Sequence, residues 1–353
     1  MVVIDGAYGE GGGQILRTAI ALSAIAKKPV EIFNIRKGRK KPGLLPQHLT
    51  GIRAAAEICR AHIEGASLGS EKLRFYPSEI RDGEYEFNVA EERGSAGATS
   101  LVFQTIVPIL VKRGKGEVLV KGGTHVPFSP IFDYMEGVLF ETLRRFFRIE
   151  IEGEILKYGF YPVGGGEVRV KIYGYKDRPE RLEFRERGKV IKRDGVSVSA
   201  NLPRDIAIRQ AKRLLERIGI ECEIRSVRAS CAGTYLFIRI ESENGIAGFS
   251  SLGMRGKRAE RVADEVVEEY LPYITSSAVI DPHLADQLPI FSIALGVPLV
   301  YITSKITRHL LTNQWVINTF FAKEIVEVEG REGREGRVEI RNLKGLTEGD
   351  YLL

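Results

Sequence analysis

A helix–strand–helix pattern recurs three times along the chain, and this recurrence constrains the fold more than any other feature of the sequence. Each copy has a turn rich in small residues, an apolar helix, a short β-branched strand, a second turn, a second helix and then two strands. The predicted first helices begin at residues 14, 98 and 284, and the second helices at 47, 130 and 309, which gives offsets of 33, 32 and 25 residues. Similar offsets in three units predict an α/β (α+β) protein with an internal repeat.

The stretch from residue 182 to residue 275 breaks this pattern. It predicts strands at 188–200, 221–227 and 234–242, and amphipathic or charged helices at 204–218 and 257–271. We interpret this βαββα segment as a small domain inserted between the second and third repeats. The expected large domain then consists of 1–181 and 276–353, with repeats at about 1–80, 81–181 and 276–341, and residues 330–353 are expected to form a hairpin and a frayed tail.

Composition narrows the class of protein. A chain of 353 residues with 44% hydrophobic and 28% charged residues can bury a large core in roughly two domains. It has no apolar run of about 18 residues and no secretory signal at its start, so we expect no membrane span. The three cysteines are widely spaced and form no CxxC pair, which favours a reducing, cytoplasmic setting over a zinc ribbon or a disulfide framework.

A glycine cluster, Gly9–Gln14, follows the predicted strand 2–5 and opens a helix. It is no P-loop, and Gln14 stands where a dinucleotide-binding turn needs its third glycine. Backbone N–H groups at such a helix start suit a phosphate or a carboxylate. Glu10 would repel a bare phosphate, but a bridging divalent cation would reconcile the two. The alternative is a tight turn in which Glu10 favours the helix dipole.

A basic loop follows the next predicted strand. Residues 36–41 contain five cations in six positions, and Arg17 lies one turn into the preceding helix. With a net charge of +6, the chain suits an anionic partner such as a nucleotide or nucleic acid, and Arg side chains give bidentate phosphate contacts. The alternative is an ordinary solvated loop.

His309 is the most chemically informative of five histidines, none of which forms a zinc-binding pair. It stands at a predicted helix start, where the helix dipole lowers the pKa of an imidazole and keeps it neutral and nucleophilic. Thr312 and Asn313 are near enough in sequence to orient its ring. Asp281, Asp286 and Gln287 are polar residues at the start of another apolar helix. For both groups of residues the alternative is helix capping.

Five separate segments, taken together, resemble the RNA 3′-terminal phosphate cyclase family. They are 5–17 (DGAYGEGGGQILR), 36–44 (RKGRKKPGL), 94–97 (GSAG), 283–287 (HLADQ) and 309–313 (HLLTN). The resemblance spans almost the whole chain. It implies three βαβαββ repeats like those of a translation initiation factor C-terminal domain, with a small inserted thioredoxin-like domain.

The resemblance also implies a reaction. Such enzymes use ATP and a divalent metal (Mg or Mn) to convert an RNA 3′-terminal phosphate to a 2′,3′-cyclic phosphodiester. AMP is transferred to a histidine and then to the RNA 3′-phosphate, and the adjacent 2′-hydroxyl releases it. The implied partner is RNA with a 3′-terminal phosphate, and no membrane partner is expected. Whether the protein forms a homodimer is left open.

Applied residue by residue, the resemblance makes His309 the nucleophile and Glu10 the metal or nucleotide contact. The implied ATP-binding residues are Gln104, His283, Leu284, Ala285, Asp286 and Gln287. The implied residues for the RNA phosphate or the triphosphate are Arg17, Arg36, Arg39 and Gln47.

Two other functions compete with this one. A non-catalytic ribosome-assembly factor would share the fold and bind RNA, but such relatives lack the histidine that stands here at position 309. A small-molecule transferase of the enolpyruvyl type is also built from βαβαββ units and binds anions through Arg and Lys.

Overall fold

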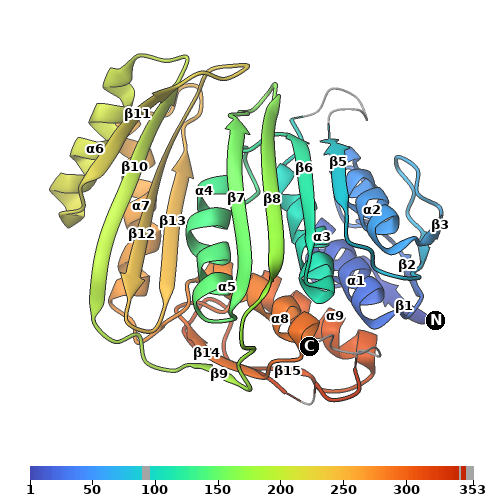
Figure 1. The fold of residues 1–353 in the computed structure, drawn as a ribbon. Coiled ribbons are helices and arrows are strands. Elements are labelled where there is room, and N and C mark those ends of the chain that lie inside the picture. Colours follow the sequence, from blue (N-terminus) through green and yellow to red (C-terminus); the bar gives the residue numbers. More distant parts are fainter. Residues whose placement is uncertain (90–95, 342, 347–353) are drawn as a thin grey trace.

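Three sheets of the protein share one strand order. The computed structural model describes residues 1–89, 96–341 and 343–346 (Figure 1). In these residues the strands form four four-stranded sheets, and three of them run β1-β2-β4-β3, β5-β6-β8-β7 and β9-β14-β16-β15. In each of the three the first pair of strands is parallel and the other two pairs are antiparallel.

The first two sheets and their helices follow the chain in order. The elements of the first are β1 (Val2–Asp5), α1 (Gly13–Ala26), β2 (Val30–Phe33), α2 (Pro46–Cys59), β3 (His62–Glu64) and β4 (Leu73–Tyr76). Those of the second are β5 (Glu84–Asn88), α3 (Thr99–Arg113), β6 (Gly116–Gly122), α4 (Phe132–Tyr134), a π-helical segment (Met135–Phe140), α5 (Glu141–Arg145), β7 (Ile149–Lys157) and β8 (Gly166–Tyr175). Gly94 and Ser95 of the turn predicted at 94–97 lie outside the described residues.

The third sheet is discontinuous in sequence, and this corrects one predicted boundary. Its elements are β9 (Leu182–Phe184), α8 (Pro282–Leu295), β14 (Leu299–Thr303), α9 (Arg308–Phe321), β15 (Val326–Gly330) and β16 (Gly336–Ile340). β9 pairs in parallel with β14, so residues 182–184 belong to this sheet and not to the inserted segment. A three-residue strand has too little periodicity to be assigned from sequence, and only its pairing with β14 identifies it. The hairpin of β15 and β16 spans 326–340 and so begins before the expected range of 330–353; residues 342 and 347–353 of the expected tail lie outside the described residues.

The inserted segment contains one strand more than predicted. Its elements are β10 (Val190–Ala200), α6 (Arg204–Ile218), β11 (Cys222–Val227), β12 (Gly233–Ser242), β13 (Ile246–Leu252) and α7 (Ala259–Ile274), in the sheet order β11-β10-β12-β13. The predicted βαββα pattern missed β13, whose glycine and two serines give a weak strand signal. A Cβ on Gly248 would lie 2.5 Å from Val138, so close packing against the large domain requires this glycine.

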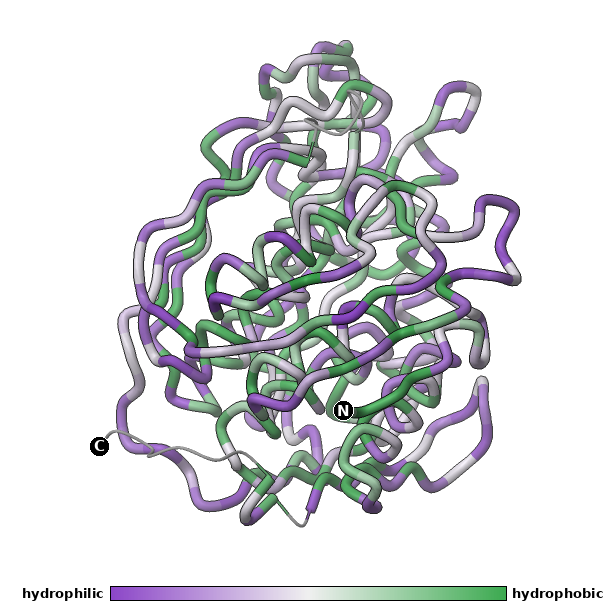
Figure 2. Tube along the Cα trace, turned by 90° about the vertical axis from the view of Figure 1, so that its right-hand side faces the viewer, coloured by the Kyte–Doolittle hydropathy of each residue, from purple (hydrophilic) through white to green (hydrophobic). Residues whose placement is uncertain are grey.

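Helices fill the centre of the large domain. Each of the three related sheets is covered by its own helices, and α1 packs against α3, α8 and α9 where the three units meet. Figure 2 shows hydrophobic segments concentrated in these interior helices and hydrophilic ones in the outer loops. The inserted sheet stands at one side of the molecule, and β13 packs against α4 and the π-helical segment (Figure 1). No helix in the described ranges is long and apolar enough to cross a membrane.

Candidate functional site

A cavity of about 790 Å³ opens where the three related units meet. It is bounded by the turn before α1, the basic loop before α2, α3, the loop before α4, α8 and the start of α9. The predicted site residues that line it are Glu10, Arg17, Arg36, Arg39, Gln47, Gln104, His283, Asp286, Gln287 and His309. The fold therefore brings together residues that lie up to 299 positions apart in the chain.

Leu284 and Ala285, the other two residues expected to bind ATP, do not line the cavity. Both side chains are fully buried in the hydrophobic core. They belong to the face of α8 that packs inward, whereas Asp286 and Gln287 follow on the cavity side. The structure thus assigns these two residues to the core and leaves the polar members of the segment at the site.

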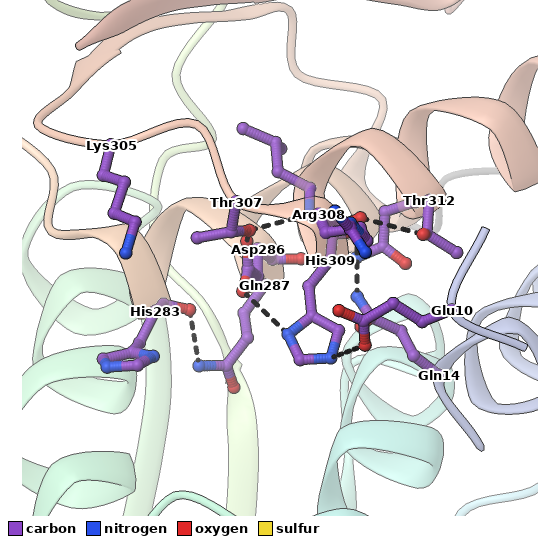
Figure 3. Close-up of polar contacts among 12 residues, drawn as sticks. Glu10, Gln14, His283, Asp286, Gln287, Lys305, Thr307, Arg308, His309 and Thr312 are labelled. Carbon is purple, nitrogen blue, oxygen red and sulfur yellow. Dashed lines mark hydrogen bonds and ion pairs between the residues drawn. The ribbon is translucent and has the colours of Figure 1, made fainter. Parts of the chain in front are cut away.

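His309 lies at the start of α9 with its ring between two carboxylates (Figure 3). Its Nε2 is 3.4 Å from Glu10 Oε2 and its Nδ1 is 3.8 Å from Asp286 Oδ2, and its side chain is 54% exposed. The helix is capped by Thr307, whose hydroxyl accepts from the Leu310 N–H, so His309 itself is not the cap. The imidazole is therefore free of a structural role at the helix terminus.

The expectation that Thr312 and Asn313 orient this ring is wrong. The Thr312 hydroxyl donates to the Arg308 carbonyl, and Asn313 Nδ2 donates to the Asp286 carbonyl at 2.6 Å. The Thr18 hydroxyl, which sequence reasoning missed, donates to Asn313 Oδ1 at 2.8 Å and so ties α1 to α9. Both residues share a helix face with His309, but their polar groups are occupied by these other partners.

The surroundings of His309 keep its imidazole neutral. Burial lowers its pKa, and the positive charges of Arg17, His283 and Arg39 lower it further, while Glu10 alone opposes them. A neutral imidazole has a free nitrogen lone pair, which is what a nucleophile needs.

Asp286 has an unusual pKa for a carboxyl group. Burial raises it to about 7, although the Thr307 hydroxyl, which donates to Asp286 Oδ1, and the positive charge of His283 both lower it. Its protonation state consequently changes near neutral pH, directly beside the Nδ1 of His309. Perturbed carboxyl groups in a cleft are typical of functional sites.

The glycine turn brings bare backbone amides to the cavity. α1 begins at Gly13 after Gly12, with no side-chain cap for its first N–H groups. A Cβ on Gly13 would lie 2.3 Å from His48 Nε2, so only glycine fits at this position. Burial, with Arg17 and Arg36 nearby, lowers the pKa of His48 to about 3 and keeps it neutral. Sequence reasoning missed His48, because nothing in the pattern predicts that α2 packs it against the turn.

The three arginines at the site differ in their partners. Arg17 forms no ion pair with a described residue, and burial lowers its pKa to about 10. Arg39 Nη2 lies 3.3 Å from Glu10 Oε2. Arg36 instead donates to the carbonyls of Lys41 and Gly43 and shapes the basic loop. A half-buried guanidinium without a counter-ion among the described residues is costly, so Arg17 marks a place for an anion.

The far side of the cavity is formed by polar groups of α3 and α8. Gln104 Nε2 donates to Gln287 Oε1 at 3.1 Å, and Gln287 Nε2 donates to the His283 carbonyl. Burial lowers the pKa of His283, but Glu269, Asp281 and Asp286 together raise it to about 9. Asp281 caps α8, because its carboxylate accepts from the His283 and Leu284 N–H groups. It also accepts from the Tyr134 hydroxyl, which sequence reasoning did not single out.

A metal ion could bind at Glu10 only with ligands from outside the protein. Across the described ranges no group of three His, Cys, Asp or Glu side chains is placed to hold an ion. Mg²⁺ commonly binds through one or two carboxylates, several waters and the phosphates of a substrate. Glu10, at the mouth of the glycine turn and beside unpaired amides, fits that mode.

Comparisons with known proteins agree on one family. A model of the RNA 3′-terminal phosphate cyclase family matches residues 8–326. A Methylococcus capsulatus protein named RNA 3′-terminal phosphate cyclase is 44% identical over 326 residues, which cover 90% of this chain and 90% of that protein. Proteins of the same name from Pyrococcus furiosus and Archaeoglobus fulgidus are 40% and 42% identical, over 96% and 94% of this chain and 98% and 99% of their own lengths.

Proposed function

Because the chain belongs to the RNA 3′-terminal phosphate cyclase family, we propose that it uses ATP to convert an RNA 3′-terminal phosphate to a 2′,3′-cyclic phosphodiester. The observation that carries this proposal is the position of His309. A neutral, half-exposed imidazole faces a cavity that also contains an arginine with no ion-pair partner among the described residues and a helix start without a side-chain cap. This combination suits attack of a nitrogen nucleophile on a bound phosphate.

In the first step, Nε2 of His309 attacks the α-phosphorus of ATP. The new N–P bond replaces the bond to the bridging oxygen, and pyrophosphate leaves. The Asp286 carboxylate, whose Oδ2 lies 3.8 Å from Nδ1, would favour the proton on Nδ1 by its charge and so leave the lone pair on Nε2. Arg17, Arg39 and the amides at the start of α1 neutralise the charge on the phosphates.

The second and third steps return His309 to its free state. An oxygen of the RNA 3′-phosphate attacks the AMP phosphorus, and the imidazole leaves with its lone pair. The neighbouring 2′-hydroxyl then attacks the RNA phosphorus, closes the cyclic phosphodiester and releases AMP. A divalent cation bound through Glu10 would supply charge stabilisation on the nucleotide phosphates.

The experiment that tests this function is label transfer from α-³²P-ATP with Mg²⁺ or Mn²⁺ in the absence of RNA. We expect an acid-labile, base-stable label on the wild-type protein and none on His309→Ala. Addition of RNA with a 3′-phosphate should discharge the label and yield the cyclic end. A folded wild-type protein that binds nucleotide but takes up no label would contradict the proposal and favour the assembly-factor or small-molecule function.

A further inference from the structure

The exposed position of Phe128 adds nothing to the stability of the fold. It lies in the loop between β6 and α4, its ring is fully exposed, and its backbone has a φ of +63°. A bulky residue with positive φ is strained, and an aromatic ring in water loses the free energy that burial would give. Phe128 therefore carries both the backbone strain and the free-energy cost of an unburied ring.

The loop that carries Phe128 is fixed on both sides. Before it, the N–H groups of Thr124 and His125 donate to the Gly159 carbonyl, and His125 Nε2 lies 2.7 Å from Asp133 Oδ2. The buried His125 ring stacks on Tyr235 with a centroid distance of 4.2 Å. After it, the Ser129 hydroxyl donates to the Val126 carbonyl. The backbone that carries the exposed ring is therefore anchored on both sides.

Phe128 and the two residues that follow it line the same cavity as His309. The cavity also has apolar walls deeper in the protein, formed by Phe103, Leu139 and Phe291. ATP loads His309 before RNA is bound, so its base cannot rely on contacts with RNA and the enclosed walls suit it. RNA is a polymer that enters from solvent, so its bases meet the exposed rim.

On the basis of the proposed function, we propose that the Phe128 ring is a stacking platform for a nucleobase at the 3′ end of the RNA substrate. Stacking on an exposed aromatic ring tolerates every base, because each base has a π face. The basic loop with Arg39 lines the same cavity and would hold the backbone phosphates that accompany the base.

Direct binding of short fluorescent RNAs with a 3′-phosphate tests this without any need for turnover. Phe128→Ala should weaken binding about 10-fold, Phe128→Leu should do the same, and Phe128→Trp should bind like the wild type. Tyr161→Ala is the matched control, because Tyr161 is an exposed aromatic residue that does not line the cavity. It should leave binding unchanged.

RNAs with a single abasic position identify which nucleobase stacks on Phe128. With an abasic site at one of the last three positions, the difference between wild type and Phe128→Ala should vanish, because one partner of the stack is already absent. AMP loading in the absence of RNA should stay within about twofold of wild type in all Phe128 variants.

Three results would overturn the proposal. They are unchanged RNA affinity in Phe128→Ala, a difference that persists with every abasic RNA, and a loss of AMP loading as large as the loss of RNA binding. The last would assign the ring to ATP. Failure of the proposed function has a different signature, which is a wild-type protein that takes up no AMP. That result does not depend on the RNA affinities of wild type and Phe128→Ala.

Discussion

Two histidines of this protein each stand beside a carboxylate, yet their surroundings differ completely. His125 has a fully buried side chain whose Nε2 lies 2.7 Å from Asp133. Its Nδ1 is 2.7 Å from the Thr124 hydroxyl, and aromatic rings stack against it. His309 is 54% exposed, and its two carboxylate neighbours lie at 3.4 and 3.8 Å.

The pKa values of the two neighbouring carboxyl groups, Asp133 and Asp286, shift in opposite directions. Burial raises the pKa of Asp133, but the hydrogen bonds and charge of His125, with the Tyr235 hydroxyl, bring it below its usual value. Burial raises the pKa of Asp286 to about 7, and its one hydroxyl partner does not reverse the shift. A close pair with all its hydrogen bonds made stabilises a fold, whereas a loose pair at a cavity leaves both groups free for chemistry.

The largest effect should come from His309→Ala. We expect AMP loading to fall about 10³-fold or more, because the variant lacks the imidazole nitrogen that forms the N–P bond. The fold should lose only about 1 kcal/mol, because Thr307 and not His309 caps α9. Label transfer and thermal unfolding measure the two effects. Full loading in a folded His309→Ala protein would refute the nucleophile.

His125→Ala should do the opposite and reduce stability while AMP loading persists. Removal of the imidazole leaves the Asp133 carboxylate buried with only the Tyr235 hydroxyl, which should cost about 3–5 kcal/mol of unfolding free energy. His125→Phe keeps the stacked ring and should still lose most of that stability. AMP loading at a low temperature should persist in both. Denaturant titration provides the measurement. A wild-type midpoint for both variants would show that the buried pair of His125 and Asp133 does not stabilise the fold.

Asp286→Asn should change pH dependence more than amplitude. Folded Asp286 keeps its proton up to about pH 7, while the unfolded carboxyl loses it near pH 4, so this group lowers the free energy of unfolding as pH rises between these values. The variant lacks this loss and should gain roughly 2–3 kcal/mol relative to wild type between pH 5 and pH 8. AMP loading should rise with pH through about 7 in wild type and be flat in the variant. Parallel pH profiles would contradict a role for Asp286 beside His309.

The smallest effect should come from Arg39→Ala. Arg39 contacts Glu10 at the exposed side of the cavity, so its loss should weaken RNA or ATP use only a few-fold and reduce the salt slope of RNA binding by about one. Arg36→Ala should instead loosen the basic loop, because Arg36 donates to two carbonyls within it. Kinetics over a salt series separate the two, and identical slopes for wild type and Arg39→Ala would exclude a phosphate contact.

Sequence periodicity located most helices and strands of the large domain, because their apolar faces repeat at helical or strand spacing over enough residues. It also located His309 at a helix start, and helix capping was the alternative left open for Asp281, which the structure confirms. It failed at β9 and β13, where a strand is too short or too polar to stand out. The resemblance placed Leu284 and Ala285 at the ATP site, whereas the structure buries their side chains in the core.

What the sequence by itself determined is therefore local: where chains of apolar residues become helices and which polar residues stand at their ends. The tertiary structure alone decided that Glu10 and Asp286 flank one imidazole, that His48 is buried against a glycine, and that Arg17 has no partner among the described residues. Propensity and capping act over a few residues, whereas burial and charge proximity depend on how distant helices pack. The chemistry of this site is set by those long-range contacts.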